Sequence, residues 1–314
     1  MIVASAALAV ILPSTVAQAD PTPAELTAQI KDSNNKLELI VESYNKITGD
    51  LATTQASLAA LQAKIAPLQS NVDTAYANVS QMAVTAYTTT SSMRTMAVLL
   101  SGSSSGDLVD QLGTLEMLSH AQSRDIKTYT DQKAGFDAEN KRLNDLLAQQ
   151  NAQKVDLEAK KAQITGDLAK LTALQNKAAK AGVKINDGSV SLGAPPPVSG
   201  KAGVAVSYAY SKIGDRYVYA TAGPTTFDCS GLTMAAWKAA GVTLPHNAAE
   251  QYSKTRHISR SQLQPGDLVF YNGLGHVAIY VGNNSVIHAP HPGAFVTGAT
   301  ITLDPIVGYG RVVG

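Results

Sequence analysis

A long run of apolar residues, spaced alternately four and three positions apart, limits most strongly what this chain can fold into. The run extends from Leu26 to Met82, and only Ser33 and Thr54 interrupt it with a polar side chain. A stripe sustained over so many heptads is typical of a coiled coil and not of a helix in a globular core. Pro67 lies inside the run, and because proline removes a backbone donor, we expect a kink or a division of the helix there.

A second, looser apolar stripe follows from Leu108 to Leu171, with polar Gln and Lys between its members. The segment 88–107 between the two stripes holds a short apolar piece and a Ser/Gly-rich turn. Two long helices with a structured link predict an antiparallel coiled-coil hairpin over residues 20–182. A helix of ~60 residues would be roughly 90 Å long, so we expect a rod.

The first 19 residues have the features of an export signal. An apolar segment of signal-peptide length is followed by Ala17-Gln18-Ala19, a small-residue cleavage pattern. The segment is too short to span a bilayer. No Lys or Arg precedes it, which a start further upstream would explain. We expect a secreted or cell-envelope protein whose mature chain begins at Asp20; the alternative is an apolar N-terminus of a cytosolic protein.

The composition changes after the rod. Residues 183–200 contain three consecutive prolines, Pro195 to Pro197, and predict a semi-rigid linker. Residues 201–314 have the size of one small globular domain. Helical patterns there are followed by apolar β-type runs. The predicted helices are 202–213 and 229–240, and the predicted strands are 267–271, 276–282 and 285–289. This order predicts an α+β domain with helices packed on an antiparallel sheet.

Charge and cysteine content exclude several functions. The formal net charge is +1, without a polybasic surface, so we expect no nucleic-acid partner. The chain has one cysteine, Cys229, which excludes an intrachain disulfide and argues against a cysteine zinc cluster. The thiol is then a buried inert group, an intermolecular bridge or a reactive nucleophile.

The position of Cys229 favours a reactive thiol. It lies at the predicted start of a helix that has Asp228 or Thr226 near its N-cap and that Gly241 ends. The N–H groups and dipole of a helix N-terminus favour the thiolate, and the same N–H groups could bind an oxyanion. A neighbouring histidine would then return the proton to a leaving amine.

His276 and His288 are the candidate base and its orienting partner. They lie on two strands that we expect to form a hairpin around residues 282–284. A three-residue loop would pair Ala278 with His288 and place both histidines on one face of the sheet. A two-residue Asn-Asn loop would place them on opposite faces.

The remaining histidines of this domain are weaker candidates. His246 and His257 are expected in surface loops, with a lesser chance of contact with substrate, and His291 in a proline-rich loop. A zinc site is a minor alternative because the chain lacks paired-histidine metal motifs. We expect neither a metal nor a cofactor.

The order of motifs resembles the NlpC/P60 cysteine peptidases of bacterial cell walls. The motifs are DCSGL, LPH, LQPGDLVF, GHVAIYVG and IHA, within residues 201–314. The resemblance implies a papain-like fold with Cys229 as nucleophile, His276 as base and His288 as the third polar member. It also implies that Tyr217 lies in the oxyanion or substrate site, and that Asp228 and Ser230 contact substrate.

One departure concerns the substrate groove. The family usually has Trp-Gly-Gly where this chain has Tyr219-Ala220-Thr221. The additional Cβ atoms would narrow or reshape the substrate groove. The sequence therefore does not determine which stem peptide is preferred, whereas the assignment of the nucleophile is unaffected.

The rod resembles the coiled-coil region of cell-wall hydrolases that act in division, and the layout is similar to mycobacterial Rip-type endopeptidases. The resemblance implies docking to a membrane complex of the cell-division ABC-transporter kind and inhibition by the rod. The expected function is an exported peptidoglycan endopeptidase that cleaves the D-isoglutamyl–diaminopimelate type of bond. The alternatives are a non-catalytic coiled-coil activator that only binds wall peptide, and an acyltransferase or amidase on the same fold.

Overall fold

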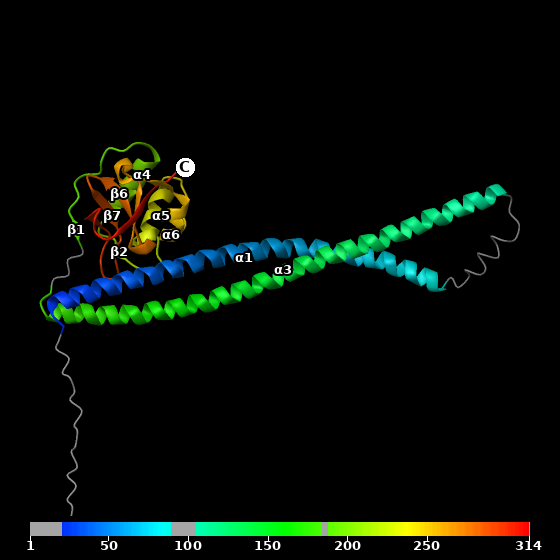
Figure 1. Ribbon diagram of the computed structural model, residues 1–314, viewed down its shortest axis with the longest axis horizontal. Helices are drawn as coiled ribbons and strands as arrows, with labels where there is room; N and C mark the ends of the chain where they lie inside the picture. Colours follow the sequence, from blue (N-terminus) through cyan, green and yellow to red (C-terminus); the bar gives the residue numbers. More distant parts are fainter. Residues whose placement is uncertain (1–20, 89–104, 184–187, 314) are drawn as a thin grey trace, which may run out of the picture. The chain divides into compact units, whose positions relative to one another are not determined.

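The computed structural model describes residues 21–88, 105–183 and 188–313. The predicted signal peptide and most of the segment 88–107 lie outside these ranges. Two long helices, α1 (Pro23–Thr88) and α3 (Ser105–Lys180), account for the two apolar stripes (Figure 1). Helix α1 continues through Pro67, so the helix is not divided there. The prediction of two long N-terminal helices is confirmed.

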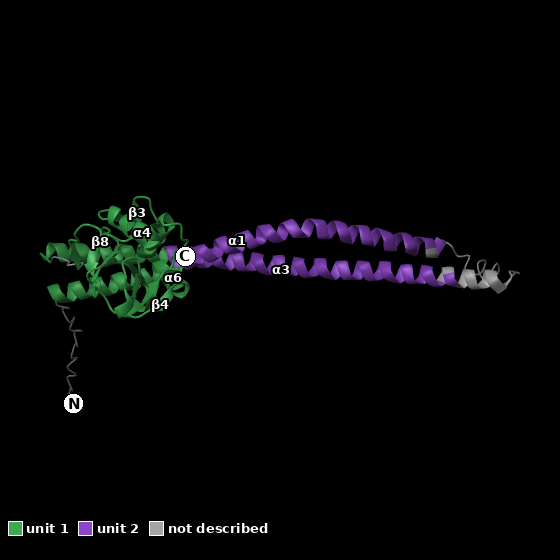
Figure 2. Ribbon diagram, turned by 90° about the horizontal axis from the view of Figure 1, so that it is seen from above, with its two compact units in different colours: residues 1–43, 162–314 green, residues 44–161 purple. Residues whose placement is uncertain are grey.

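The chain divides into two compact units (Figure 2). The hairpin unit comprises residues 44–161, and the globular unit comprises residues 1–43 and 162–314. In the hairpin unit, the α1 stripe is buried at Leu58, Leu61 and Val72. The rings of Tyr76 and Tyr129 lie 5.8 Å apart, which places α1 beside α3 there. None of the helices in the described ranges is long and apolar enough to cross a membrane.

The globular unit contains a seven-stranded sheet in which every neighbouring pair is antiparallel. This confirms the predicted α+β class. The strand order is β1-β8-β7-β6-β5-β9-β4. The strands are β1 (Ser189–Val190), β4 (Arg256–Ile258), β5 (Leu268–Tyr271), β6 (His276–Gly282), β7 (Ser285–His288), β8 (Thr297–Thr300) and β9 (Ile306–Arg311). The first of these, β1, comes from the predicted linker, so part of that segment is an edge strand and not a spacer.

Three helices accompany the sheet: α4 (Gly200–Ser211), α5 (Cys229–Ala239) and α6 (Ala248–Lys254). Helices α4 and α5 contact each other and β6. Apolar side chains of these helices, such as Val206 and Leu232, form one core with the residues of β6 that alternate with His276, namely Val277 and Ile279. Two short parallel strands, β2 (Arg216–Tyr217) and β3 (Thr226–Phe227), precede α5, and single 3₁₀ turns occur at Arg260–Gln262 and Asn272–Leu274. Helix α5 therefore starts directly beside the sheet.

The β6–β7 hairpin differs in detail from the prediction. Gly282 pairs with Ser285, so the loop is a two-residue Asn283-Asn284 turn and not three residues. Both asparagines have positive φ, 49° and 58°, as a tight primed hairpin turn requires. The register then shifts between Tyr280 and Gly282, and beyond this bulge Ile279 pairs with Ile287. The bulge compensates for the missing loop residue, and the two histidines still share one face.

Candidate active site

Cys229 is the first residue of α5, and its side chain is 1% exposed. Asp228 caps the helix, because its Oδ1 accepts a 2.7 Å hydrogen bond from the Gly231 amide. A Cβ atom at Gly231 would lie 2.2 Å from the Thr221 carbonyl oxygen. Only glycine therefore allows this helix start to approach residue 221, which explains the glycine of the DCSGL motif.

The environment of the thiol holds it in the neutral form. The Cys229 thiol accepts a hydrogen bond from the Val277 amide, which favours the thiolate, and its Sγ lies 3.4 Å from Glu42 Oε1. Burial raises the pKa of the Cys229 thiol well above its usual value, and the negative charges of Glu42 and Asp228 add to this. In this conformation Cys229 is buried, protonated and bound to a carboxylate.

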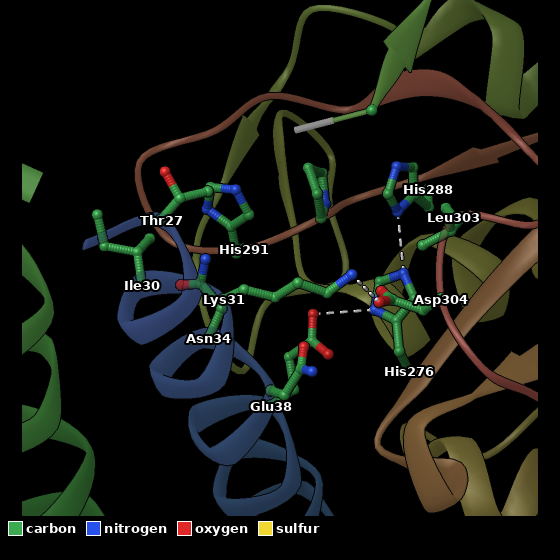
Figure 3. A pocket seen from close by; sticks show the side chains of 13 residues that line it. Thr27, Ile30, Lys31, Asn34, Glu38, His276, His288, His291, Leu303 and Asp304 are labelled. Carbon is green, nitrogen blue, oxygen red and sulfur yellow. Dashed lines mark hydrogen bonds and ion pairs between the residues drawn. The ribbon is translucent and has the colours of Figure 1, made fainter. Parts of the chain in front are cut away.

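His276 and His288 meet on the sheet, as their sequence positions predicted. His276 Nε2 and His288 Nδ1 lie 2.9 Å apart, and the two rings are perpendicular (Figure 3). Glu38 Oε1 lies 3.1 Å from the other nitrogen of His276. Burial alone would lower the pKa of His276, but the charge and hydrogen bond of Glu38 raise it overall. Burial and the neighbouring His276 hold the pKa of His288 well below its usual value.

The opposite pKa shifts define the proton arrangement of the pair. The raised pKa of His276 and the lowered pKa of His288 favour the His276 Nε2–H as donor and the His288 Nδ1 as acceptor. The His276 ring is held from both sides, by Glu38 and by His288. Its position beside Val277, whose amide contacts the Cys229 thiol, places it next to the candidate nucleophile.

Helix α1 supplies both carboxylates of this site, one helical turn apart. Glu42 Oε2 accepts a 2.5 Å hydrogen bond from the Ala248 amide, and the Glu42 carbonyl accepts one of 2.8 Å from Asn247 Nδ2. Burial and the nearby Asp228 charge raise the pKa of Glu42 to about 7. A face of α1 that includes Asn34, Glu38 and Glu42 is buried beside the apolar stripe. The start of α1 therefore covers the thiol and the histidine pair.

Sequence reasoning missed Glu38 and Glu42. In the sequence they are two acidic residues on a coiled-coil helix, where charges are normally solvated. The only available signal was their spacing of four, which places them together on one helix face.

A cavity of about 190 Å³ lies between α1 and the histidine pair (Figure 3). Its lining includes Lys31, Asn34 and Glu38 from α1, and His288 and His291 from the globular domain. A salt bridge of 2.8 Å between Lys31 and Asp304 crosses one side of it. Across the described ranges, no cluster of His, Cys, Asp and Glu side chains is arranged to hold a metal ion.

The other residues implied by the family resemblance lie around the start of α5. Tyr217 is buried at the end of β2, and its backbone amide binds the Ala294 carbonyl. Burial raises the pKa of the Tyr217 hydroxyl well above its usual value. Ser230 is fully buried, and its carbonyl accepts a hydrogen bond from Gln251.

His246 lies in the loop between α5 and α6 and its side chain is partly exposed, as expected, but it is not free on the surface. Its Nε2 lies 2.8 and 2.9 Å from the two carboxylate oxygens of Asp228, a contact that the sequence did not predict. His257 lies in β4 and stacks on Tyr252, away from the cysteine. His291 is half-buried and lines the cavity beside the histidine pair.

The segment 219–221, where the family usually has Trp-Gly-Gly, still has a backbone conformation typical of glycine at Ala220. Ala220 has φ 54°, in the left-handed region that an alanine Cβ disfavours by roughly 1–2 kcal/mol. We therefore expect Ala220→Gly to stabilise the globular unit by about 1 kcal/mol and to raise its melting temperature by roughly 2–4 °C. Ala240→Gly is the control for the measurement by circular dichroism, because Ala240 has φ −84° and should gain nothing. An equal increase in both variants would contradict the role of the left-handed backbone.

Comparison with known proteins identifies relatives of the globular domain. Residues 214–302 match the NlpC/P60 family. The chain is 45% identical over 91 residues to the probable endopeptidase p60 of Listeria monocytogenes, covering 28% of this chain and 19% of the relative. It is 40% identical over 104 residues to the probable endopeptidase Cgl2188 of Corynebacterium glutamicum (33% and 49%) and 40% identical over 90 residues to the peptidoglycan endopeptidase RipA of Mycobacterium tuberculosis (28% and 19%). The alignments thus cover between about a fifth and a half of these relatives' own length.

Two of the solved structures that match part of this chain have TM-scores below 0.5. The NlpC/p60 domain of the peptidoglycan hydrolase SagA is 33% identical, with a TM-score of 0.34, covering 35% of this chain and 98% of that one. The peptidoglycan hydrolase RipB of M. tuberculosis is 25% identical, with a TM-score of 0.35, covering 40% and 75%. From the sequence matches, residues 214–302 of this chain are an NlpC/P60 domain.

Proposed function

We propose that this protein is a peptidoglycan D,L-endopeptidase that cleaves stem peptides at the D-isoglutamyl–diaminopimelate type of bond. The observation that carries the proposal is a lone cysteine at the N-terminus of a buried helix, beside a bonded pair of histidines. The relatives of the same domain include named endopeptidases. That these relatives are endopeptidases supports the reaction class, and the stem-peptide bond follows from the family resemblance.

The reaction uses the groups at the start of α5. His276 takes the proton of Cys229, and the thiolate attacks the scissile carbonyl carbon. The tetrahedral intermediate collapses when His276 gives the proton to the leaving amine, which leaves a thioester on Cys229. Water, deprotonated by His276, then hydrolyses the thioester and releases the carboxylate. His288 keeps the His276 ring in the orientation that both proton transfers require.

Tyr217 and the first amides of α5 are the proposed oxyanion donors. The Tyr217 hydroxyl is buried and has no hydrogen-bond partner within the described part of the chain. A buried, unpaired donor is costly in the resting protein, and an oxyanion would satisfy it. Asp228 and Ser230 flank the nucleophile and are the proposed substrate contacts.

Regulation by the coiled coil is part of the same proposal. Glu42 binds the thiol and Glu38 binds His276, so the described conformation leaves no room for substrate at either group. The start of α1 must move before catalysis. In this proposal, a membrane complex of the cell-division ABC-transporter kind moves it by binding the hairpin unit, outside the cytoplasm. Exposed apolar side chains on that unit, including Val84, Tyr87 and Met117, support a docking role.

The test is hydrolysis of soluble muropeptides by the full chain, in the wild type and in a variant opened by Glu38→Ala and Glu42→Ala. We expect product amine and carboxylate in equal amounts, and about 10³-fold or greater loss when Cys229→Ala is added. Product formation at an unchanged rate would exclude Cys229 as the nucleophile. Binding of muropeptides without any product would favour the alternative of a non-catalytic scaffold.

A further inference from the structure

The ion pair between His246 and Asp228 lies directly beside the candidate nucleophile. Asp228 is 0% exposed, and one imidazole nitrogen of His246 bonds both of its carboxylate oxygens. The side chain of His246 is 23% exposed, so it can exchange protons with solvent. His246 therefore pairs with Asp228, the carboxylate that directly precedes Cys229 in the sequence.

Asp228 has two opposing effects on the site. As the N-cap it binds the Gly231 amide and holds the start of α5 in place. Its negative charge, however, contributes to raising the pKa of the Cys229 thiol and of the Tyr217 hydroxyl. If no cation neutralised Asp228, its charge would thus disfavour the Cys229 thiolate that the reaction needs.

We propose that His246, as an imidazolium, is a positioning residue that neutralises Asp228 and thereby favours formation of the Cys229 thiolate. The inference rests on the proposed role of Cys229 as nucleophile. Because His246 Nε2 binds both oxygens, it also fixes the carboxylate toward the Gly231 amide. A Cβ atom at Gly231 would lie 2.9 Å from both His246 Nε2 and Asp228 Oδ1, so the three groups form one packed assembly.

The charged neighbours of His246 agree with this role. Burial alone would lower its pKa, but the hydrogen bond and charge of Asp228, with a contribution from Glu42 on α1, raise it overall. When α1 leaves, Glu42 leaves with it, and Asp228 remains as the anion that holds the proton on His246. The charge compensation is therefore a property of the open site and does not depend on the inhibitory helix.

The test measures how fast iodoacetamide alkylates the lone cysteine as a function of pH. All proteins are full-length and carry Glu42→Ala, which removes the side chain that contacts the thiol. We expect His246→Gln to slow alkylation about tenfold at pH 7 and to displace the pH dependence to higher pH, because a nearby opposite charge shifts a pKa by one unit or more. His246→Arg keeps a permanent cation and should remain within about twofold of the parent.

A double-mutant cycle separates charge compensation from packing. With Asp228→Asn, which preserves an N-cap, adding His246→Gln should change the rate less than about twofold. Equal slowing by His246→Gln and His246→Arg, or no change in either, would overturn the proposal. If His246→Gln does not fold, the imidazole titration of His246 by NMR replaces it, and its pKa must fall when Asp228→Asn is introduced. A parent that alkylates rapidly but hydrolyses no muropeptide would contradict the endopeptidase proposal and leave this one standing.

Discussion

Replacing both Glu38 and Glu42 by alanine is expected to make Cys229 in the full chain react with iodoacetamide about 10–100 times faster. In the covered conformation the substitutions leave the Ala248 amide and His276 Nδ1 without their acceptors. An unpaired buried donor costs about 1–3 kcal/mol, whereas both groups bind water once α1 has moved away. The covered state no longer has to desolvate two carboxylates, and this stabilises it in part. The expected effect is therefore smaller than the sum of the costs of the two unpaired donors. The chain has one cysteine, so the reagent reports on this site alone.

The matched control removes two other carboxylates from the same helix. Asp32→Ala with Asp50→Ala eliminates exposed side chains that pair with lysines on α1. This control should react at the wild-type rate. The same rate in the Glu38→Ala, Glu42→Ala protein would show that the two carboxylates do not hold α1 over the site. Hydrolysis of muropeptides should increase in parallel with alkylation.

The second large effect is a dependence of the covered state on pH. Glu42 has a pKa of about 7 when covered, against a model-peptide value of 4.5 when α1 is free. The covered state therefore binds a proton more tightly than the open state, and protonation favours it. The contribution of the Glu42 titration to the stability of the covered state is fully present below about pH 4.5, decreases as the pH rises, and is lost above about pH 7. Acid should close the site, and neutral to alkaline pH should open it.

The groups that face Glu42 act in a defined direction. Burial and the charge of Asp228 oppose its ionisation, whereas hydrogen bonds from the Ser230 side chain, the Ala248 amide and the Cys229 thiol favour it. His276 also has a raised pKa when it is covered, so its contribution has the same sign as that of Glu42. The lowered pKa of His288 acts in the opposite sense in acid. A measurement must therefore isolate Glu42 from the histidines.

The ratio of alkylation rates between wild type and Glu42→Gln achieves this. Gln cannot ionise and resembles the protonated carboxyl. Alkylation occurs in the open state, where Glu42 has left the thiol and the histidines, so their titrations in that state are common to both proteins. We expect the ratio to rise on the order of 50-fold between pH 5 and pH 8, from the pKa difference given above. An exposed carboxylate of the same helix provides the control, since Asp32→Asn should leave the ratio near one at every pH. A flat ratio for Glu42→Gln would show that its titration is not linked to opening.

Much of the fold follows from local chemistry that the sequence carries. The 4-3 spacing required long helices because apolar side chains at those positions share one face. Strand β6 has the predicted bounds, His276–Gly282, and Asp228, one of the two residues predicted near the N-cap of α5, caps this helix. The sequence also predicted that His276 and His288 share one face, although for a partly wrong reason. The loop has two residues and not three, and a bulge after Tyr280 restores the register. Strand pairing determines this bulge, and the local sequence does not predict it.

By itself, the sequence determined the α+β class, the long helices, and the cysteine and two histidines that share a site, because periodicity, caps and motif order are local. Only the tertiary structure decided which charges meet them. Glu38 and Glu42 are about two hundred positions away in the chain from the groups they bind, and His246 reaches Asp228 across the loop after α5. Burial then changes the protonation of the whole cluster, because desolvation and neighbouring charge depend on packing and not on residue type. The same cysteine motif that predicts a reactive thiol is therefore found protonated and covered by its own helix.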